Sequence, residues 1–202
     1  MRKLFLIIVL FTFTLSLFAQ EREKKFHAGI KAGMNTSQMT GDGFAGFYKF
    51  SVVVGAFANT KVNDKWKFQY ELIYQGKGSH KPARPDKGDY QSYKARLNYI
   101  EVPLLFQFQM KKFELEFGPG LGFLIGSKEW DQNGRETTYN NYRTLELDAM
   151  LGLNYYVSDH LFVNIRSHHS VTSVVTTTAV TPYGTYGGAW NIVLALTANY
   201  QF

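Results

Sequence analysis

The sequence contains no cysteine, which excludes disulfide bridges, thiolate metal sites and a lipid-modified cysteine. It also lacks any run of about 20 apolar residues, the length that a helix needs to span a bilayer. A strong excess of one sign of charge is missing too: 22 basic and 16 acidic residues give a formal net charge of +6. This mild excess does not indicate a nucleic-acid-binding protein. The 202 residues provide room for one domain.

The N-terminus carries the pattern of an export signal. Arg2 and Lys3 precede an apolar run that begins at Leu4 and ends near a small residue, Ala19. This order is typical of a secretory signal peptide, with cleavage after Ala19. We therefore expect residues 1–19 to be a signal peptide and residues 20–202 to be the functional domain.

Most of the remaining chain alternates between apolar and polar residues with the period of a β-strand. The clearest example is "WKFQYELIYQ" at 66–75, where Trp66, Phe68 and Tyr70 share one parity. Similar runs lie at 26–35, 50–59, 98–110, 113–123, 144–156, 161–169 and 190–202. The sequence therefore predicts eight strands whose two faces differ in polarity.

The connections between these runs alternate between long and short along the chain. In an antiparallel up-and-down barrel, this alternation puts every short turn at one rim and every long loop at the other. Short periplasmic turns, long external loops and strands of about 10 residues are typical of outer-membrane barrels. We predict an all-β protein, an eight-stranded antiparallel up-and-down transmembrane β-barrel in the bacterial outer membrane.

A soluble eight-stranded barrel that binds a ligand inside is the alternative, and it would turn the apolar parity inward. Two observations favour the membrane barrel. Aromatic residues gather at the ends of the apolar faces, as interfacial girdles do; they are Trp66, Tyr74, Phe106, Phe108, Trp190, Tyr200 and Phe202. The opposite parity carries ionisable groups that we expect to form a polar network inside the lumen: Lys31, Glu71, Glu101, Glu114, Glu116, Glu146, Asp148, Arg166 and His168.

Several stretches resemble those of a known family. They are "GIKAGMN", "FQYELIYQGKG", "LNYIEVPLLFQF", "FELEFGPGLGFLIG" and the closing "LALTANYQF", whose alternating aromatics also resemble a barrel-assembly signal. Together they are similar to the PorT-like outer membrane beta-barrel family of Bacteroidota. The resemblance implies an outer-membrane barrel and, through the member that gave the family its name, a role accessory to protein secretion. It implies no catalytic residues and no cofactor.

Two groups of residues suggest a catalytic site, but we favour a structural interpretation of both. His168, His169 and Ser170 suggest a lipid hydrolase at the outer rim, but neighbouring strand residues face opposite sides. The carboxylates Glu114, Glu116, Glu146 and Asp148 suggest acid–base work, yet we expect them to pair with Lys31 and Arg166 and to fill the lumen. We predict a non-enzymatic protein, and keep the hydrolase as an alternative.

The histidines show no metal-ligand spacing, and we expect neither a metal site nor a cofactor. They are His27, His80, His160, His168 and His169.

A basic segment between residues 76 and 96 is the strongest candidate for contact with a partner. We assign to it a basic loop made of Lys77, Lys81, Arg84, Lys87 and Lys94. Ammonium and guanidinium groups on an external loop bind phosphates through charge-assisted hydrogen bonds. The expected partners are therefore outer-membrane lipid, lipopolysaccharide and other envelope proteins.

Overall fold

The computed structural model describes residues 26–44, 46–176 and 188–202, so the predicted signal peptide lies outside the described residues. The described chain is built from β-strands, with one short 3-10 helix, η1 (Pro85–Lys87). The strands are β1 (Phe26–Thr40), β2 (Lys49–Lys61), β3 (Trp66–Lys81), β4 (Tyr93–Met110), β5 (Phe113–Trp130), β6 (Glu136–Thr137), β7 (Leu145–Tyr156), β8 (Leu161–Ser170) and β9 (Trp190–Gln201). None of the helical segments in this part of the chain has the length and apolarity to cross a membrane.

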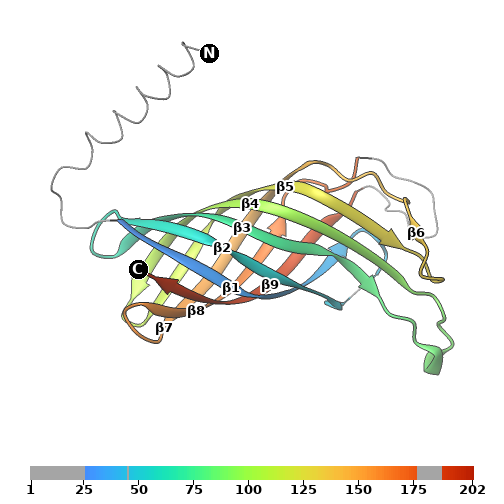
Figure 1. Ribbon diagram of the computed structural model, residues 1–202, viewed down its shortest axis with the longest axis horizontal. Coiled ribbons are helices and arrows are strands. Elements are labelled where there is room, and N and C mark those ends of the chain that lie inside the picture. Colours follow the sequence, from blue (N-terminus) through green and yellow to red (C-terminus); the bar gives the residue numbers. More distant parts are fainter. Residues whose placement is uncertain (1–25, 45, 177–187) are drawn as a thin grey trace, which may run out of the picture.

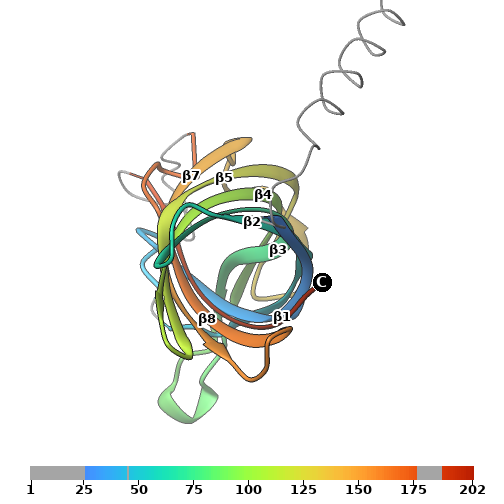
Figure 2. The ribbon, with the colours of Figure 1, turned by 90° about the vertical axis from the view of Figure 1, so that its left-hand side faces the viewer.

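Eight long antiparallel strands close into a barrel, and the two-residue β6 extends the edge of β5. Each long strand pairs with its neighbours in the chain, and β1 pairs with β9 from Gly29 opposite Gln201 to Thr40 opposite Trp190. Figure 2 shows the closed ring. The final residue takes part in this closure, because the Phe202 N–H donates to the Ala28 carbonyl at 2.8 Å. The predicted eight-stranded antiparallel barrel is confirmed.

Short and long connections separate to opposite ends of the barrel (Figure 1). Residues 62–65, 111–112 and 157–160 form the short-turn end, together with the start of β1 and the end of β9. The described parts of the connections at the long-loop end are residues 41–44, 46–48, 82–92, 131–144, 171–176 and 188–189. The predicted basic loop between residues 76 and 96 is too long, because β3 continues to Lys81 and β4 begins at Tyr93.

The apolar parity of the strands faces outward. Phe50 is 70% exposed, Met34 65% and Leu196 58%, whereas the opposite parity is buried. Rings gather at the short-turn end of this outer wall, where Trp66 lies 5.0 Å from Phe108 and Tyr200 lies 5.7 Å from Phe202 between ring centroids. An exposed apolar wall with an aromatic rim is what lipid surroundings require. The soluble barrel with an apolar interior is therefore wrong.

Candidate functional site

The middle of the lumen is occupied by charged side chains from four strands. The Arg166 guanidinium on β8 donates to both carboxylate oxygens of Glu71 on β3, each at 2.8 Å. Its Nε donates to Glu116 on β5 at 2.6 Å. The Lys31 ammonium on β1 reaches both oxygens of Glu71 at 3.0 Å. These four groups are almost completely buried, so they form a closed layer across the barrel.

Gly152 makes room for this layer. It lies on β7 directly between Glu116 on β5 and Arg166 on β8. A Cβ atom at this position would come within 2.5 Å of the Glu116 Oε1 atom, which accepts from Arg166. The missing side chain therefore lets two residues that are separated by a strand meet over the backbone of β7.

A second layer lies nearer the long loops and is centred on Lys77. The Lys77 ammonium lies 2.6 Å from Glu101 and 2.7 Å from Asp148, and 3.3 Å from Glu146. Gly122 of β5 lies directly between Glu101 and Glu146, and so leaves space for both carboxylates. Three carboxylates thus surround one ammonium in the barrel interior.

His168 extends this second layer. Its Nδ1 atom lies 3.6 Å from Glu101 and 3.2 Å from the amide nitrogen of Gln75. Glu101, Asp148 and His168 each offer a ligand atom, and these atoms lie within 4.8 Å of one another. Sequence spacing gave no sign of this grouping, because its members come from three different strands. The Lys77 ammonium is the cation that lies within ion-pair distance of both Glu101 and Asp148.

A third layer lies at the short-turn end. The Lys67 ammonium lies 2.6 Å from Glu114 and donates to the Tyr156 hydroxyl at 3.2 Å. Asn154 connects this layer to the middle one, because its amide nitrogen donates to Glu114 at 3.0 Å and to Glu116 at 3.2 Å. Hydrogen-bonded ionic groups therefore extend along the lumen from the short-turn end.

The long-loop end of the lumen is filled by apolar side chains. The cluster consists of Met39, Tyr93, Ala95, Leu97, Tyr99, Val174, Val175 and Ala189, all buried. Beyond it, the Glu129 carboxylate accepts from the Tyr142 hydroxyl and the Asn140 amide, both at 2.7 Å, and from the Tyr93 hydroxyl. An apolar cluster and a satisfied carboxylate thus cover the polar layers on this side.

The structure places all the residues of the expected lumen network on the inner face, and all of them are buried. It adds Lys67 and Lys77 to them. The assignment of Lys77 to an external basic loop is wrong, because its side chain is buried at the centre of the second layer. Lys67 shares the inward parity of Gln69 and Glu71, and this parity was the signal that could have identified it.

The other members of the predicted basic segment lie at the long-loop end. Arg84 and Lys87 belong to the connection around η1, whereas Lys81 ends β3 and Lys94 lies in β4. Lys81 lies 3.0 Å from Asp89 and lowers the pKa of that exposed carboxyl by hydrogen bonding. Only part of the segment is therefore a loop.

Next to this segment, β4 and β5 present cations on the outer face of the barrel. Arg96 lies directly opposite Lys128, and Lys94 lies directly opposite Trp130. Both Lys94 and Arg96 lie 5.7 Å from the centre of the Trp130 ring. Lys128 has a partner in Glu136 at 3.0 Å, but among the described residues Lys94 and Arg96 have no carboxylate within ion-pair distance. We call Lys94, Arg96, Lys128 and Trp130 the cationic face.

The proposed hydrolase residues are not arranged around a shared reaction centre. The Ser170 hydroxyl oxygen accepts from the backbone N–H of Asn191 at 2.7 Å, and no hydrogen bond joins it to His168 within the described chain. His169 is exposed on the outer face, while His168 faces Glu101. The triad geometry needed for acyl transfer is therefore missing among these residues.

The comparisons with known proteins identify the family. The model of the outer membrane protein beta-barrel domain matches residues 18–175. The chain belongs to this family. In this family of outer-membrane barrels, the short-turn end is the periplasmic one and the long loops face outward. The predicted outer-membrane location is confirmed.

Solved structures with the same fold are distant in sequence. Ail, the attachment invasion locus protein of Yersinia pestis, is 14% identical over 88% of this chain and 99% of its own, with a TM-score of 0.51. Neisserial surface protein A is 13% identical over 90% of this chain and 100% of its own, with a TM-score of 0.57. At such identities the likeness concerns the barrel fold alone. No curated protein matches the chain in sequence.

Proposed function

We propose that this outer-membrane barrel is a non-conducting, non-enzymatic interaction component of the envelope. We further propose that its cationic face binds phosphate groups of lipopolysaccharide. A lumen filled with ion pairs and capped by apolar side chains leaves the outer surface and the loops as the places where partners bind. The observation that carries the proposal is the direct juxtaposition of Arg96 and Lys128 across β4 and β5.

Like charges directly opposite each other destabilise a sheet. Glu136 offsets this repulsion at Lys128 only, and a phosphate beside Arg96 would supply the missing counter-charge through charge-assisted hydrogen bonds. The position along the strand supports a lipid ligand. Arg96 faces outward like Ile100 on the same strand, and it lies nearer the long loops than Ile100 does. Ile100 pairs with the exposed Phe123 of the apolar wall. The cations therefore follow directly after the apolar wall, at the level where headgroups begin.

Binding of lipopolysaccharide to the full chain in maltoside detergent tests the proposal. We expect the double variant Lys94→Gln/Arg96→Gln to bind at least about tenfold more weakly than wild type, since two charge-assisted contacts are lost. The matched control Lys87→Gln/Arg135→Gln removes two loop cations and should bind like wild type. Equal weakening by both variants, or binding that survives removal of the lipid phosphates, would contradict the proposal.

A soluble polyanion offers a simpler first assay. Ail has been crystallised in complex with the heparin analogue sucrose octasulfate. The same compound can be titrated into both double variants of this chain, because it needs no micelle. Weaker binding to Lys94→Gln/Arg96→Gln alone is the expected result.

A role accessory to protein secretion is a second proposal, supported by the stretches that resemble the PorT-like family of Bacteroidota. A deletion strain profiled for secreted proteins tests it. We expect a changed set of secreted proteins, and an unchanged set would count against the secretion role.

The non-enzymatic part of the proposal has its own test. Ser170→Ala and His168→Ala should leave the lipid profile of the native host unchanged. A lipid species that depends on both side chains, with a folded barrel in each variant, would instead support the rim hydrolase.

A further inference from the structure

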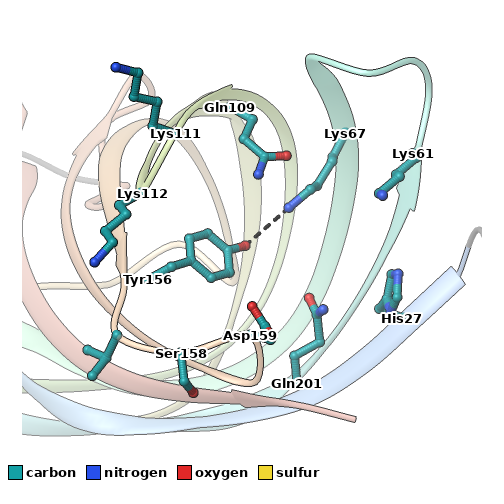
Figure 3. Close-up of a pocket in the computed structure, with 11 residues that line it drawn as sticks. His27, Lys61, Lys67, Gln109, Lys111, Lys112, Tyr156, Ser158, Asp159 and Gln201 are labelled. Atoms are coloured by element: carbon teal, nitrogen blue, oxygen red, sulfur yellow. Dashed lines mark hydrogen bonds between the residues drawn. The ribbon is translucent and has the colours of Figure 1, made fainter.

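The short-turn end of the barrel contains a cavity of about 440 Å³ at the mouth of the lumen. Figure 3 shows its lining, which comes from strand ends near the mouth, from the β4–β5 and β7–β8 turns, and from the two ends of the described chain. The Lys67–Glu114 pair and Tyr156 close its inner side. The cavity is therefore a blind recess open to the periplasm, distinct from the cationic face at the opposite end.

Positive charge dominates this recess. Lys61, Lys67, Lys111 and Lys112 line it, whereas Asp159 is the acidic residue of the lining. Lys67 is neutralised by Glu114. Lys61, Lys111 and Lys112 are exposed, and within the described chain none of them has a carboxylate within ion-pair distance. We call Lys61, Lys67, Lys111 and Lys112 the basic mouth.

Neutral hydrogen-bond donors complete the lining. Gln109 and Gln201 come from two different strands and point toward the recess with Lys67 (Figure 3), whereas the Tyr156 hydroxyl donates to Glu114 at 3.3 Å. The Gln201 side-chain oxygen accepts from Asn59 at 3.1 Å, which orients its amide group. Ammonium groups with neutral donors beside them are the groups that bind carboxylates and phosphates.

The backbone of the β4–β5 turn supports a role for these lysines. Lys111 and Lys112 alone connect Met110 to Phe113, and Lys111 has φ 56°. It is the one non-glycine residue with positive φ in the part of the chain that the structure describes. Turns of this length favour asparagine or glycine at such positions. A lysine there keeps its charge at the mouth in spite of an unfavourable backbone conformation.

We propose that the basic mouth is a periplasmic anion-binding site, which takes a phosphate or carboxylate group of a molecule dissolved in the periplasm. The blind recess means that the ligand binds without passing through the barrel. The volume admits a group larger than a single inorganic ion, and the exposed lysines at the rim attract it electrostatically.

Calorimetric titration of the full chain in maltoside detergent tests this site, with pyrophosphate and citrate as probes. We expect saturable binding of at least one probe with a stoichiometry of one, and weaker affinity at higher salt. Each exposed ammonium that is removed should weaken binding by about two- to fivefold. Lys112→Gln should show this loss, whereas Lys65→Gln, a cation of the same end that does not line the recess, should not.

The variant Lys111→Asn separates a ligand-binding role from a structural one. Asparagine tolerates positive φ better than lysine, so the variant should unfold at the same or a higher urea concentration while binding the probe more weakly. Two outcomes would overturn the proposal: no saturable binding of either probe, or binding that Lys111→Asn and Lys112→Gln leave unchanged.

Phospholipid headgroups are another source of phosphate at this end of the barrel. The titration is therefore repeated in nanodiscs that contain anionic phospholipid. Binding that persists there supports a site for soluble anions. Binding that disappears there means that headgroups occupy the mouth, and the proposal of a soluble ligand fails.

Discussion

The Arg166 guanidinium binds the Glu71 carboxylate through two parallel hydrogen bonds of 2.8 Å, although 95 positions separate the two residues in the chain. They face each other across the lumen, from β8 and β3, and the Lys31 ammonium binds the same carboxylate. A bidentate pair in a buried place is strong and geometrically specific. It joins strands that are not neighbours in the barrel.

Removal of Arg166 should therefore destabilise the barrel strongly. In Arg166→Met, Glu71 and Glu116 share only Lys31 as a buried counter-charge, and breaking a buried pair in this way costs about 3–5 kcal/mol. Urea unfolding in detergent, followed by tryptophan fluorescence, measures the loss. The double variant Arg166→Met/Glu116→Gln should recover part of it, because one unpaired charge is gone. Equal stability of wild type and Arg166→Met would contradict this account.

Gly152 offers a second test of the same layer. Gly152→Val places a branched side chain between Glu116 and Arg166, where a Cβ atom alone would lie 2.5 Å from the Glu116 Oε1 atom. We expect a loss of about 1–3 kcal/mol from overpacking, read from the urea midpoint. Gly134→Val is a poor comparison because Gly134 has φ 71°. Gly126→Val on β5 is the better control and should cost less, because a Cβ atom there would come no closer than 3.7 Å to the Asn98 side chain.

The second layer predicts that stability lost through one substitution is partly restored by a second substitution. Lys77→Met removes the ammonium that Glu101, Glu146 and Asp148 surround, so about 3–5 kcal/mol should be lost. Glu146→Gln in that background should restore part of the stability, because it removes one repulsive charge. The same substitution in the wild-type protein should stabilise it less or destabilise it. Identical effects of Glu146→Gln in both backgrounds would show that Lys77 and Glu146 are not coupled.

The external Lys81–Asp89 pair predicts a pH effect outside the membrane. Lys81 lowers the pKa of Asp89, so the pair is present above the ordinary carboxyl pKa and is lost as the pH falls through the lowered value. Nuclear magnetic resonance titration of Asp89 should give a pKa below the ordinary range in the wild type. In Lys81→Met it should return toward that range, and an unchanged value would show that the pair does not form in solution.

Strand positions and facing could be predicted because they depend on local alternation. In "WKFQYELIYQ" the alternation assigns each residue to a face, and parity alone predicts that Glu71 faces inward. Beyond the apolar wall the alternation between apolar and polar residues is lost. The stretch from Gly76 to His80 contains no large apolar side chain, so its sequence predicts a loop, although its backbone continues to pair with β4.

Most partners inside the lumen could not be predicted, because they depend on register between strands. The expected pairing of Arg166 with Glu114, Glu116, Glu146 and Asp148 holds for Glu116. Glu114 instead pairs with Lys67, and Glu146 and Asp148 pair with Lys77. Lys31 meets Glu71 two strands away, past Gly55, which lies opposite Lys31 on β2. Nothing in the local sequence of either residue indicates this contact. The grouping of Glu101, Asp148 and His168 has the same origin, since it depends on the register of β4, β5, β7 and β8.

Single-channel recording in a planar bilayer tests the central claim, that ion pairs and an apolar cluster close the lumen. The inserted barrel, verified by its heat-dependent mobility on a gel, should give no discrete conductance steps under an applied potential. Regular steps from the folded wild-type protein would mean that an open pore passes through the layers around Arg166 and Lys77, and would contradict the account.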